Sequence, residues 1–405
     1  MIQLGDCFNL QDFVEAARQR LPKPLFHYIA GGADDELTQH ANTAAFDRYN
    51  LVPRYLRDIR HVDMRKLVLG FDLQWPLLLA PTGMNRLFHP DGEMAVANAA
   101  ADAGVGYALS TMATTAIEQV AAARAGPRMY QLYLLKDDAL NIAMIERCRT
   151  AGFDAICLTV DTVVAGNRER DLRNGLSVPP RLGLRNLPRF AQRPRWCLNY
   201  LAAGGISLPN VPATGGDKGL STLAGYFAAN MEQNISWGRV EKLMAHWGKP
   251  FVIKGLQTVD DARNAAAAGV QGIIVSNHGG RQLDGTAATI DLIADIVDAV
   301  GNQLDVILDG GVRRGTHLVK AMAMGASACM LGRPYLYGLA AFGQPGVQRV
   351  LSLLKQETQR TLALLGCSSF DDLGRQHVHA ADRLPQFLSS TTDPGRSRPL
   401  VRSIK

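Results

Sequence analysis

The chain has 405 residues, of which 47% are apolar and 20% are charged, and its formal net charge is +6. This balance is typical of a globular protein with a large core, and it excludes a disordered chain. No apolar run approaches the roughly 18 residues of a membrane-spanning helix, and the first residues lack the basic and apolar regions of a secretory signal, so we expect a cytoplasmic protein.

Residues 1–75 are expected to form a mostly helical lead-in, since the stretches LQDFVEAARQRL and FHYIAGGADDE have helical patterns. Beyond them, short apolar runs alternate with helical segments. Nearly every residue in these runs is apolar, as expected of parallel strands that are covered on both faces. The runs occupy residues 76–81, 106–110, 128–133, 155–161, 250–255, 272–277, 305–311 and 328–334.

Eight strand–helix units predict a (β/α)8 barrel of the TIM type over residues 76–366, followed by a C-terminal tail over residues 367–405. A doubly wound open sheet is the alternative fold, but it normally has fewer units and a nucleotide-binding loop after an early strand. Neither GxGxxG after a strand nor GxxxxGK[ST] occurs, and the six cysteines include no CxxC pair. We therefore predict neither a nicotinamide site nor a metal site.

Residues 162–236 form an insertion that is too long for an ordinary loop of a barrel. Between Asp171 and Asp217 there is no acidic residue, and the arginines of this stretch account for the whole net charge, which indicates a local basic patch rather than a nucleic-acid-binding domain. Leucines and aromatic residues, including Phe190 and Trp196, lie among the arginines, a composition suited to an anionic membrane surface. A solvated lid and a subunit contact are the alternatives. The arginines are Arg173, Arg181, Arg185, Arg189, Arg193 and Arg195.

Catalytic groups of such barrels lie at the carboxyl ends of the strands, and every predicted strand here brings a polar group to that rim. Helix capping explains individual Ser, Thr and Asn residues, but it does not explain Lys254, His278, Arg281 and Arg333. His278 is suited to act as a general base near neutral pH, with Asp161 as the acid that orients it. Lys254 is placed to hold positive charge against a reduced, anionic cofactor ring.

Two further features of the rim favour anionic ligands. Arg281 and Arg168 match the geometry of a carboxylate. The segments DGGVRRG and LGRP, after the last two predicted strands, combine glycine-exposed backbone N–H groups with Arg313 and Arg333, as in phosphate sites. A surface turn with solvated arginines is the alternative for these segments. The combination predicts a phosphorylated cofactor or a sugar phosphate.

With these residues in place, the chain resembles the FMN-dependent α-hydroxy acid dehydrogenase and oxidase family, which includes glycolate oxidase, L-lactate dehydrogenase and mandelate dehydrogenase. The resemblance covers about residues 8–367, and SNHGGRQLD at 276–284 is the family's active-site signature. GNRERDLRNG at 166–175 and RPRW at 193–196 look closest to the mandelate dehydrogenase branch. The other matching segments are LPKPLFHYIAGGADDE at 21–36, QLY at 131–133, LTVDT at 158–162, VIKG at 252–255 and LDGGVRRGT at 308–316.

The resemblance implies oxidation of an L-2-hydroxy acid, lactate-like or mandelate-like, to the 2-oxo acid. His278 would be the base and Asp161 its partner, in either a hydride-transfer or a carbanion mechanism. The remaining substrate contacts would come from Arg168, Arg281, Tyr28 and Tyr133, with Tyr133 near the reacting oxygen. FMN would be held by Pro81, Thr82, Gly83, Ser110, Gln131, Thr159, Lys254, Ser276, Asp309, Gly310, Gly311, Arg313, Gly332 and Arg333.

Two departures from the family pattern bear on the substrate and the electron acceptor. Many glycolate-type oxidases have Trp where this chain has Met112, so we expect a different side-chain pocket and a substrate larger than glycolate. Dehydrogenase-type members tend to have Gly where Gly83 stands, whereas oxidases often have Ala, which favours a dehydrogenase.

The resemblance also implies partners and a location. A homo-oligomer, by resemblance a tetramer, is expected. If the insertion binds a membrane, as in the mandelate dehydrogenase branch, electrons would pass to a membrane quinone and the enzyme would be peripheral on the cytoplasmic face of the inner membrane. Oxygen is the alternative acceptor. A barrel isomerase that uses FMN or phosphate alone is the alternative of another class, and SNHGGRQLD argues against it.

Overall fold

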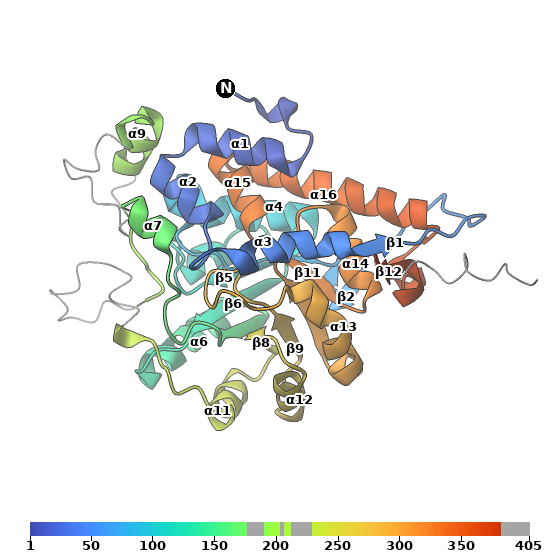
Figure 1. The fold of residues 1–405 in the computed structure, drawn as a ribbon. Helices are drawn as coiled ribbons and strands as arrows, with labels where there is room; N and C mark the ends of the chain where they lie inside the picture. The colour runs from blue at the N-terminus through green and yellow to red at the C-terminus, as the bar shows by residue number, and fades with distance from the viewer. Residues whose placement is uncertain (176–189, 203–205, 212–228, 382–405) are drawn as a thin grey trace, which may run out of the picture.

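The fold was obtained as a computed structural model, which describes residues 1–175, 190–202, 206–211 and 229–381. Eight parallel strands close into a barrel in the order β10-β11-β4-β5-β6-β7-β8-β9, so the first barrel strand along the chain pairs with the last. Helices surround the strands (Figure 1). The predicted (β/α)8 barrel is confirmed. The strands are β4 (Leu77–Leu79), β5 (Gly106–Ser110), β6 (Arg128–Tyr133), β7 (Ala155–Thr159), β8 (Phe251–Leu256), β9 (Gly272–Val275), β10 (Asp305–Asp309) and β11 (Ala328–Leu331).

The helices between the strands begin and end at the residues that local chemistry favours. Thr258 caps its helix, since its Oγ1 accepts a hydrogen bond of 3.1 Å from the Asp261 N–H. Gly104 and Gly248 end two others in the left-handed conformation, with φ of 64° and 68°. These helices are α4 (Gly92–Ala103), α5 (Ile117–Ala121), α6 (Asp138–Thr150), α11 (Trp237–Trp247), α12 (Val259–Ala267), α13 (Thr289–Val300) and α14 (Gly315–Ala323).

Two helices that the sequence did not single out follow the last strand. They are α15 (Arg333–Phe342) and α16 (Gln344–Leu365). The second buries one face, including Val347, Val350 and Leu354, and packs against α4, α14 and α15. Helix α1 (Leu10–Arg20) of the lead-in lies over α15 (Figure 1). The N-terminal and C-terminal parts of the chain therefore form one layer outside the barrel.

A hairpin closes the barrel at the amino ends of the strands. Its strands are β2 (Lys66–Val68) and β3 (Phe71–Leu73), which pair in antiparallel register. Val68, Leu69, Phe71 and Leu73 join one buried cluster with barrel side chains such as Leu78 and Met330. The barrel interior is therefore closed at the amino ends of the strands, and the carboxyl ends remain available for the functional site.

The rest of the lead-in runs towards the carboxyl ends of the strands. It contains α2 (Lys23–Ala30), α3 (Leu37–Ala44) and the short strand β1 (Tyr49–Leu51). Strand β1 pairs in antiparallel register with β12 (Val378–Ala380), so the first residues of the expected C-terminal tail are folded onto the lead-in. The 3-10 helices are η1 (Leu4–Asp6), η2 (Ala45–Arg48), η3 (Asn85–Leu87), η4 (Phe370–Asp372) and η5 (Arg375–His377).

The insertion between β7 and β8 contains α7 (Glu169–Arg173) and α9 (Pro194–Ala202), while Arg181, Arg185 and Arg189 lie outside the described residues. Phe190 and Trp196 are only 1% and 8% exposed, and the Trp196 indole N–H donates to the Leu87 carbonyl at 2.8 Å. The expectation that these two aromatic residues face a membrane is wrong, because both anchor α9 to the protein body. In the described parts of the chain, no helix combines the length and the apolar character needed to cross a bilayer.

Candidate functional site

The strand register places the predicted site residues beside one another at the carboxyl end of the barrel. Ser110 of β5 is opposite Gln131 of β6, and Ser110 Oγ donates to Gln131 Oε1 at 2.9 Å. Thr159 of β7 is paired with Tyr133 on one side and with Lys254 of β8 on the other. Parallel strands therefore deliver these five polar side chains to one rim.

A buried ion pair joins three neighbouring strands at this rim. Lys254 Nζ lies 2.7 Å from Asp309 Oδ2 of β10 and donates to Ser276 Oγ at 2.8 Å. The Ser276 hydroxyl in turn donates to Asp309 Oδ2 at 2.8 Å. Burial alone would lower the pKa of Lys254, but the nearby carboxylates of Asp309 and Asp161 outweigh it and raise the pKa. Lys254 is therefore a fixed positive charge at the bottom of the site.

His278 follows β9 in a sharp turn that brings its ring to Asp161 and Tyr133. Its φ is 56°, in the left-handed region, and its N–H donates to Ser276 Oγ at 3.0 Å. Its Nδ1 lies 2.9 Å from Asp161 Oδ1, and its Nε2 lies 3.5 Å from the Tyr133 hydroxyl. The arrangement is that of a general base held by a carboxylate.

The pKa shifts in this group favour the base form of His278. Burial lowers the pKa of His278 by more than Asp161 raises it. Burial acts to raise the pKa of Asp161, but the His278 ring and the Lys254 charge keep that pKa below its usual value. Near neutral pH an ionised Asp161 therefore accepts the Nδ1 proton of a neutral imidazole, and the lone pair of Nε2 is left for the substrate. Burial also raises the pKa of Tyr133, so its phenol stays protonated.

The lead-in completes the turn that carries His278. The amides of Asn42 and Asn277 donate to each other's oxygens at 2.8 Å, and the Ala33 N–H donates to the Gly280 carbonyl at 2.8 Å. A Cβ on Gly280, whose φ is 71°, would lie 2.4 Å from the backbone nitrogen of Gln39, so only glycine fits there. The active-site turn therefore depends on direct packing against the lead-in.

Two arginines, Arg281 and Arg333, come together beside this turn. Arg281 Nη1 donates to the carbonyls of Tyr28 and Gly31, at 2.7 and 3.0 Å, and its guanidinium lies over the Tyr28 ring. Arg333 donates to the carbonyls of Ile29, Gly31 and Gly279 at 2.8–2.9 Å. These bonds satisfy the last carbonyls of α2. Arg333, predicted to bind phosphate, thus also holds the lead-in to the barrel.

Arg281, Arg313 and Arg333 repel one another, and the carboxylates that act on them, Asp171 and Asp309, only partly offset this repulsion. Burial and the charges of Arg281 and Arg313 lower the pKa of Arg333 to about 9. Burial lowers the pKa of Arg313, and burial together with the Arg168 charge lowers that of Arg281. Buried cations that repel one another are stabilised by an anionic ligand. This cluster fits the predicted phosphate and carboxylate groups.

Polar atoms that point into the site also fit a bound cofactor and substrate. Gln131 Nε2, Thr159 Oγ1 and Arg168 Nε are buried, and each has no hydrogen-bond partner among the described residues. Such groups are costly unless a ligand or water satisfies them. The donors face the region where the predicted FMN ring and substrate would lie, so the residues present fit this cofactor.

The loops after β4 and β5 form the remaining wall. Thr82 Oγ1 donates to Asn85 Oδ1 at 2.7 Å, and the Met84 N–H donates to the Met112 carbonyl at 2.9 Å. A Cβ on Gly83 would lie 2.9 Å from Met112 Cβ, so the two loops touch at this point. Pro81, Thr82, Gly83, Ser110, Gly310, Gly311 and Gly332 all lie at or just beyond strand ends on this rim.

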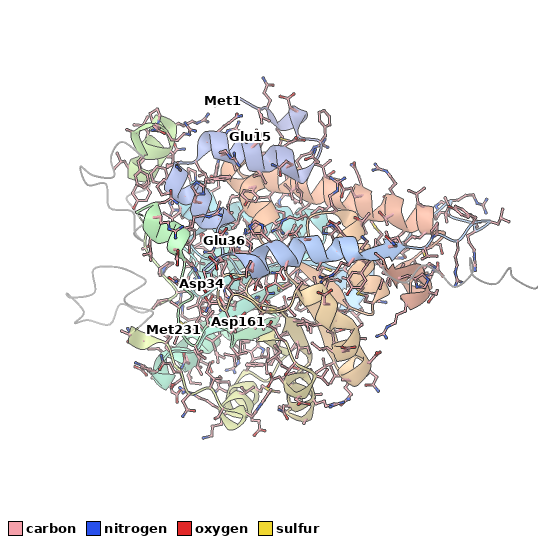
Figure 2. All side chains as sticks on the ribbon, in the orientation of Figure 1. Met1, Glu15, Asp34, Glu36, Asp161 and Met231 are labelled. Atoms are coloured by element: carbon pink, nitrogen blue, oxygen red, sulfur yellow. The ribbon has the colours of Figure 1, made fainter. Side chains whose placement is uncertain are left out.

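Sequence reasoning missed several residues that shape the site. Glu36 forms an ion pair with Arg170 of α7, and Asp34 accepts a hydrogen bond of 2.8 Å from the Asn167 side chain (Figure 2). Gln282 Nε2 donates to the carbonyls of Asp161 and Val164, at 3.1 and 2.8 Å. These contacts hold the start of the insertion against the lead-in and the His278 turn. The only sequence signal for them was their position inside the matching segments.

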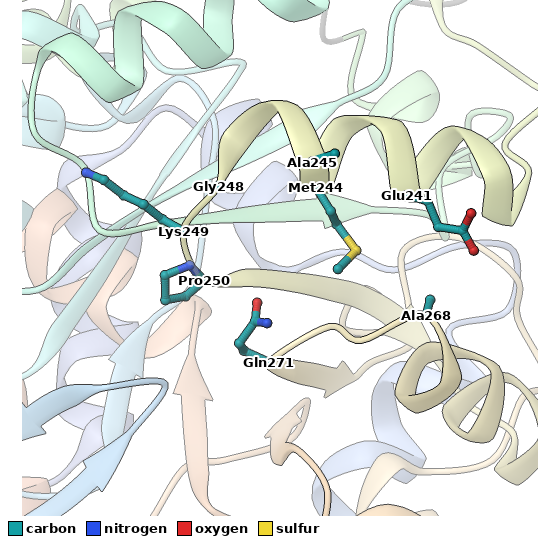
Figure 3. Close-up of a pocket in the computed structure, with 8 residues that line it drawn as sticks. All are labelled: Glu241, Met244, Ala245, Gly248, Lys249, Pro250, Ala268 and Gln271. Carbon is teal, nitrogen blue, oxygen red and sulfur yellow. The ribbon is translucent and has the colours of Figure 1, made fainter.

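A hollow of about 560 Å³ lies elsewhere, beside α11 and the amino end of β8 (Figure 3). Two of its polar side chains are already engaged: Gln271 Oε1 accepts the Phe251 N–H at 2.7 Å, and Lys249 Nζ donates to the Phe153 carbonyl at 3.2 Å. It faces away from the strand ends that carry the polar residues. We therefore assign the chemistry to the rim.

Comparisons with known proteins agree with this site. A family model described as FMN-dependent dehydrogenase matches residues 17–380. An L-lactate oxidase from a Nostoc species is 42% identical over 94% of this chain and all of the relative, and glycolate oxidase 1 of Oryza sativa subsp. indica is 41% identical over 94% and 98%.

Two solved structures extend the comparison. The monotopic membrane protein (S)-mandelate dehydrogenase superposes with a TM-score of 0.88 at 35% identity, covering 93% of this chain and all of the other. A mandelate oxidase gives 0.80 at 37% identity, covering 92% and 98%. The family resemblance predicted from the sequence is confirmed.

The buried ion pair gives a first prediction. Lys254→Met leaves the Asp309 carboxylate buried without its partner, so it should lower the free energy of unfolding in urea by about 3–5 kcal/mol. Lys66→Met is the control: Lys66 pairs with Asp371 at the surface, and its loss should cost less than about 1 kcal/mol. Adding Asp309→Asn to Lys254→Met should recover part of the stability. Equal losses in the two single variants would contradict the assigned charge network.

The His278–Asp161 pair gives a second prediction, which an NMR titration of ¹³C-labelled histidine can check. The pKa of His278 should lie below the ordinary value of about 6.5. Asp161→Asn removes the carboxylate that raises this pKa, so it should move the titration to still lower pH. His278→Asn identifies the signal by its loss, and Asp291→Asn, at a carboxylate bonded to Tyr49, should change nothing. A titration that moves to higher pH in Asp161→Asn would refute the pairing.

Proposed function

The chain belongs to the FMN-dependent dehydrogenase family, and on that premise we propose that it oxidises an L-2-hydroxy acid, lactate-like or mandelate-like, and passes the electrons to a membrane quinone. The family makes it an FMN-dependent oxidoreductase of 2-hydroxy acids. The observation that carries the proposal is the rim where His278, with its Asp161 partner, lies beside a cluster of half-buried arginines.

The substrate carboxylate would be bound by Arg281 and Arg168. Arg281 uses Nη1 to hold the end of α2, so its other edge remains for a bidentate contact. Arg168 precedes α7 and has a buried Nε with no hydrogen-bond partner among the described residues. The Tyr133 hydroxyl, 3.5 Å from the base, would donate to the reacting oxygen, and Tyr28 would complete the contacts.

His278 Nε2 would take up a proton that the 2-hydroxy acid loses on oxidation. The imidazolium formed is stabilised by Asp161, 2.9 Å from Nδ1, in the way the acid of a triad stabilises its histidine. The 2-hydroxy acid loses two protons and two electrons in becoming the 2-oxo acid. His278 would take one proton, and the other proton would leave with the two electrons that FMN accepts when bound. Tyr133 and Lys254 are buried, and the His278 side chain is only 20% exposed, which limits the access of bulk water to the reacting atoms.

FMN, when bound, supplies the acceptor for the two electrons. Ser110, Gln131, Thr159 and Lys254 are placed to hydrogen-bond its ring and ribityl chain. Ser276, whose hydroxyl is already engaged by Lys254, His278 and Asp309, would act by holding Lys254 in position. The fixed charge of Lys254 would stabilise negative charge on the reduced ring. The phosphate would lie at the glycine-rich ends of β10 and β11, near Arg313 and Arg333.

The wall of the site that is formed by the loops after β4 and β5 favours a substrate with a sizeable side chain. Met112 is half-buried there, and its thioether is flexible and adapts to different shapes. Many glycolate-type oxidases carry the larger Trp at this place. The similarity to an L-lactate oxidase and to mandelate enzymes supports a substrate of this range.

The acceptor assignment rests on Gly83 and on the surface of α9. Leu198 and Leu201 of this helix are 68% and 63% exposed. Arg193 Nη2 donates to the Arg18 carbonyl at 3.3 Å. The pKa of Arg20 is lowered mainly by burial and also by the charge of Arg195. Arginines of α1 and of the insertion therefore share this face. Apolar and cationic groups together suit an anionic lipid surface. Oxygen is the second candidate, because several relatives are oxidases.

Anaerobic flavin spectroscopy tests the activity. L-lactate or (S)-mandelate should bleach the visible absorbance of the FMN-loaded protein, and His278→Asn should slow this reduction roughly 100-fold or more while FMN still binds. Asn is chosen because it tolerates the left-handed backbone at this position. His379→Asn, at an exposed histidine of β12, is the matched control. Reduction at a native rate in His278→Asn would rule out the assigned base.

Liposome co-sedimentation tests the membrane assignment. The protein should sediment with anionic vesicles at low salt and less at high salt, because arginine contacts are screened whereas leucine insertion is not. Leu198→Ser with Leu201→Ser should reduce sedimentation and quinone-linked activity, and should leave activity with an artificial dye unchanged. Leu364→Ser, at an exposed leucine of α16, is the control. A wild-type protein that stays in the supernatant at low salt would move the acceptor assignment to oxygen.

A further inference from the structure

Glu93, in the first turn of α4, is a fully buried carboxylate next to the site. Its Oε1 accepts the backbone N–H groups of Asn85 and Thr114 at 3.0 and 2.8 Å. Its Oε2 accepts the hydroxyls of Thr114 and Thr115 at 2.7 and 2.8 Å. No salt bridge to Glu93 occurs in the described parts of the chain, so these four donors are what satisfy its buried oxygens.

The four donors belong to two different loops. Asn85 lies in the loop after β4, which carries Pro81, Thr82 and Gly83, whereas Thr114 and Thr115 lie in the loop after β5, which carries Met112. The Arg86 N–H also donates to Thr114 Oγ1 at 3.2 Å, so the same threonine joins the two loops a second time. Glu93 is therefore the common acceptor that brings them together.

The contact held in this way is close. A Cβ at Gly83 would lie 2.9 Å from Met112 Cβ and 3.2 Å from the Met112 carbonyl oxygen. Met84, between Gly83 and Asn85, adopts a left-handed φ of 59°, a strained conformation for this residue that the surrounding bonds must maintain. A small change at Glu93 would change the spacing of Gly83 and Met112.

We propose that Glu93 is a positioning residue that sets the gap between these loops, and that it thereby selects the side chain of the 2-hydroxy acid and the fit of FMN against Gly83. The inference rests on the proposed function for the substrate and on the family for FMN. Glu93 touches neither ligand and acts only through the backbone and hydroxyl groups that it holds.

The chemistry of a carboxylate suits this task better than that of other side chains. It offers acceptor sites in two directions and has no donor of its own, so it holds two N–H groups and two hydroxyls at once. Glutamine has the same shape, and threonine hydroxyls can reverse to accept from its amide. Glu93→Gln should therefore preserve most of the geometry, whereas loss of a single hydroxyl donor should not.

The test uses Thr115→Val, which removes one donor to Glu93 and keeps the side-chain shape. The FMN-loaded variant should show an altered visible circular dichroism of the flavin. Its ratio of kcat/KM for (S)-mandelate to that for L-lactate should change by roughly 2- to 10-fold, as expected for the loss of one hydrogen bond. FMN affinity, from fluorescence titration of the apoprotein, should weaken by a similar factor. Glu93→Gln should retain near-native values in all three measurements.

Thr358→Val is the matched control, since Thr358 is a buried threonine of α16 whose hydroxyl donates to the Leu354 carbonyl at 2.8 Å. It should lower thermal stability about as much as Thr115→Val and leave the substrate ratio and the flavin signal unchanged. The proposal is overturned if Thr115→Val behaves like this control. If the wild-type protein oxidises no 2-hydroxy acid, the proposed function fails, while the flavin dichroism and FMN affinity still decide whether Glu93 positions the loops.

Discussion

The hydroxyl of Ser276 connects the buried charges of the site to its base. It accepts from the Lys254 ammonium and from the His278 backbone N–H, and it donates to Asp309. A hydroxyl has one proton and two lone pairs, so all its bonding capacity is used. The position of His278 is thus fixed relative to Lys254, whose charge is itself stable only because Asp309 is paired with it. Three strands and the active-site turn share this one group.

A second consequence of burying so much charge is that the rim is built by two distant parts of the chain. Without each other, the last carbonyls of α2 would lack these partners, and Arg281 and Arg333 would lose their bonds to Tyr28, Ile29 and Gly31. Joining the lead-in to the barrel satisfies both. The Asn42–Asn277 amide pair acts in the same way. The lead-in is therefore part of the site rather than an appendage to the barrel.

Much of the architecture followed from the sequence because each strand and its polar end are adjacent in the chain. Lys254, His278 and Asp309 were recognisable in this way, and so was the fold. Other features depend on contacts that no local pattern records. Arg333 was read as a phosphate ligand, but its bonds to Ile29 and Gly31 come from about three hundred residues away.

Four residues show why local composition misleads. Glu93 looked like an ordinary acidic residue in the first turn of an alanine-rich helix, yet it is a buried hydrogen-bonding centre. Phe190 and Trp196 lie in a basic, leucine-containing segment that predicts exposure, but both pack against the protein body. The left-handed backbone of His278 was likewise hidden, since the following glycines indicate a turn without showing that the histidine takes part in it.

The hydrogen bonds of Arg281 and Arg333 to the end of α2 also bear on how the chain folds during synthesis. Synthesis produces α2 and β1 early, but the groups that hold them, Arg281, Arg333 and β12, emerge only in the last third of the chain. Pairings between such distant segments are slow to form, because much of the chain must be ordered before they contribute. The lead-in must therefore remain without its final partners during most of translation, with the carbonyls of α2 and the apolar face of α1 open to water or to a chaperone. The active site is therefore completed only after Arg281, Arg333 and β12 have joined the lead-in, which is late in folding.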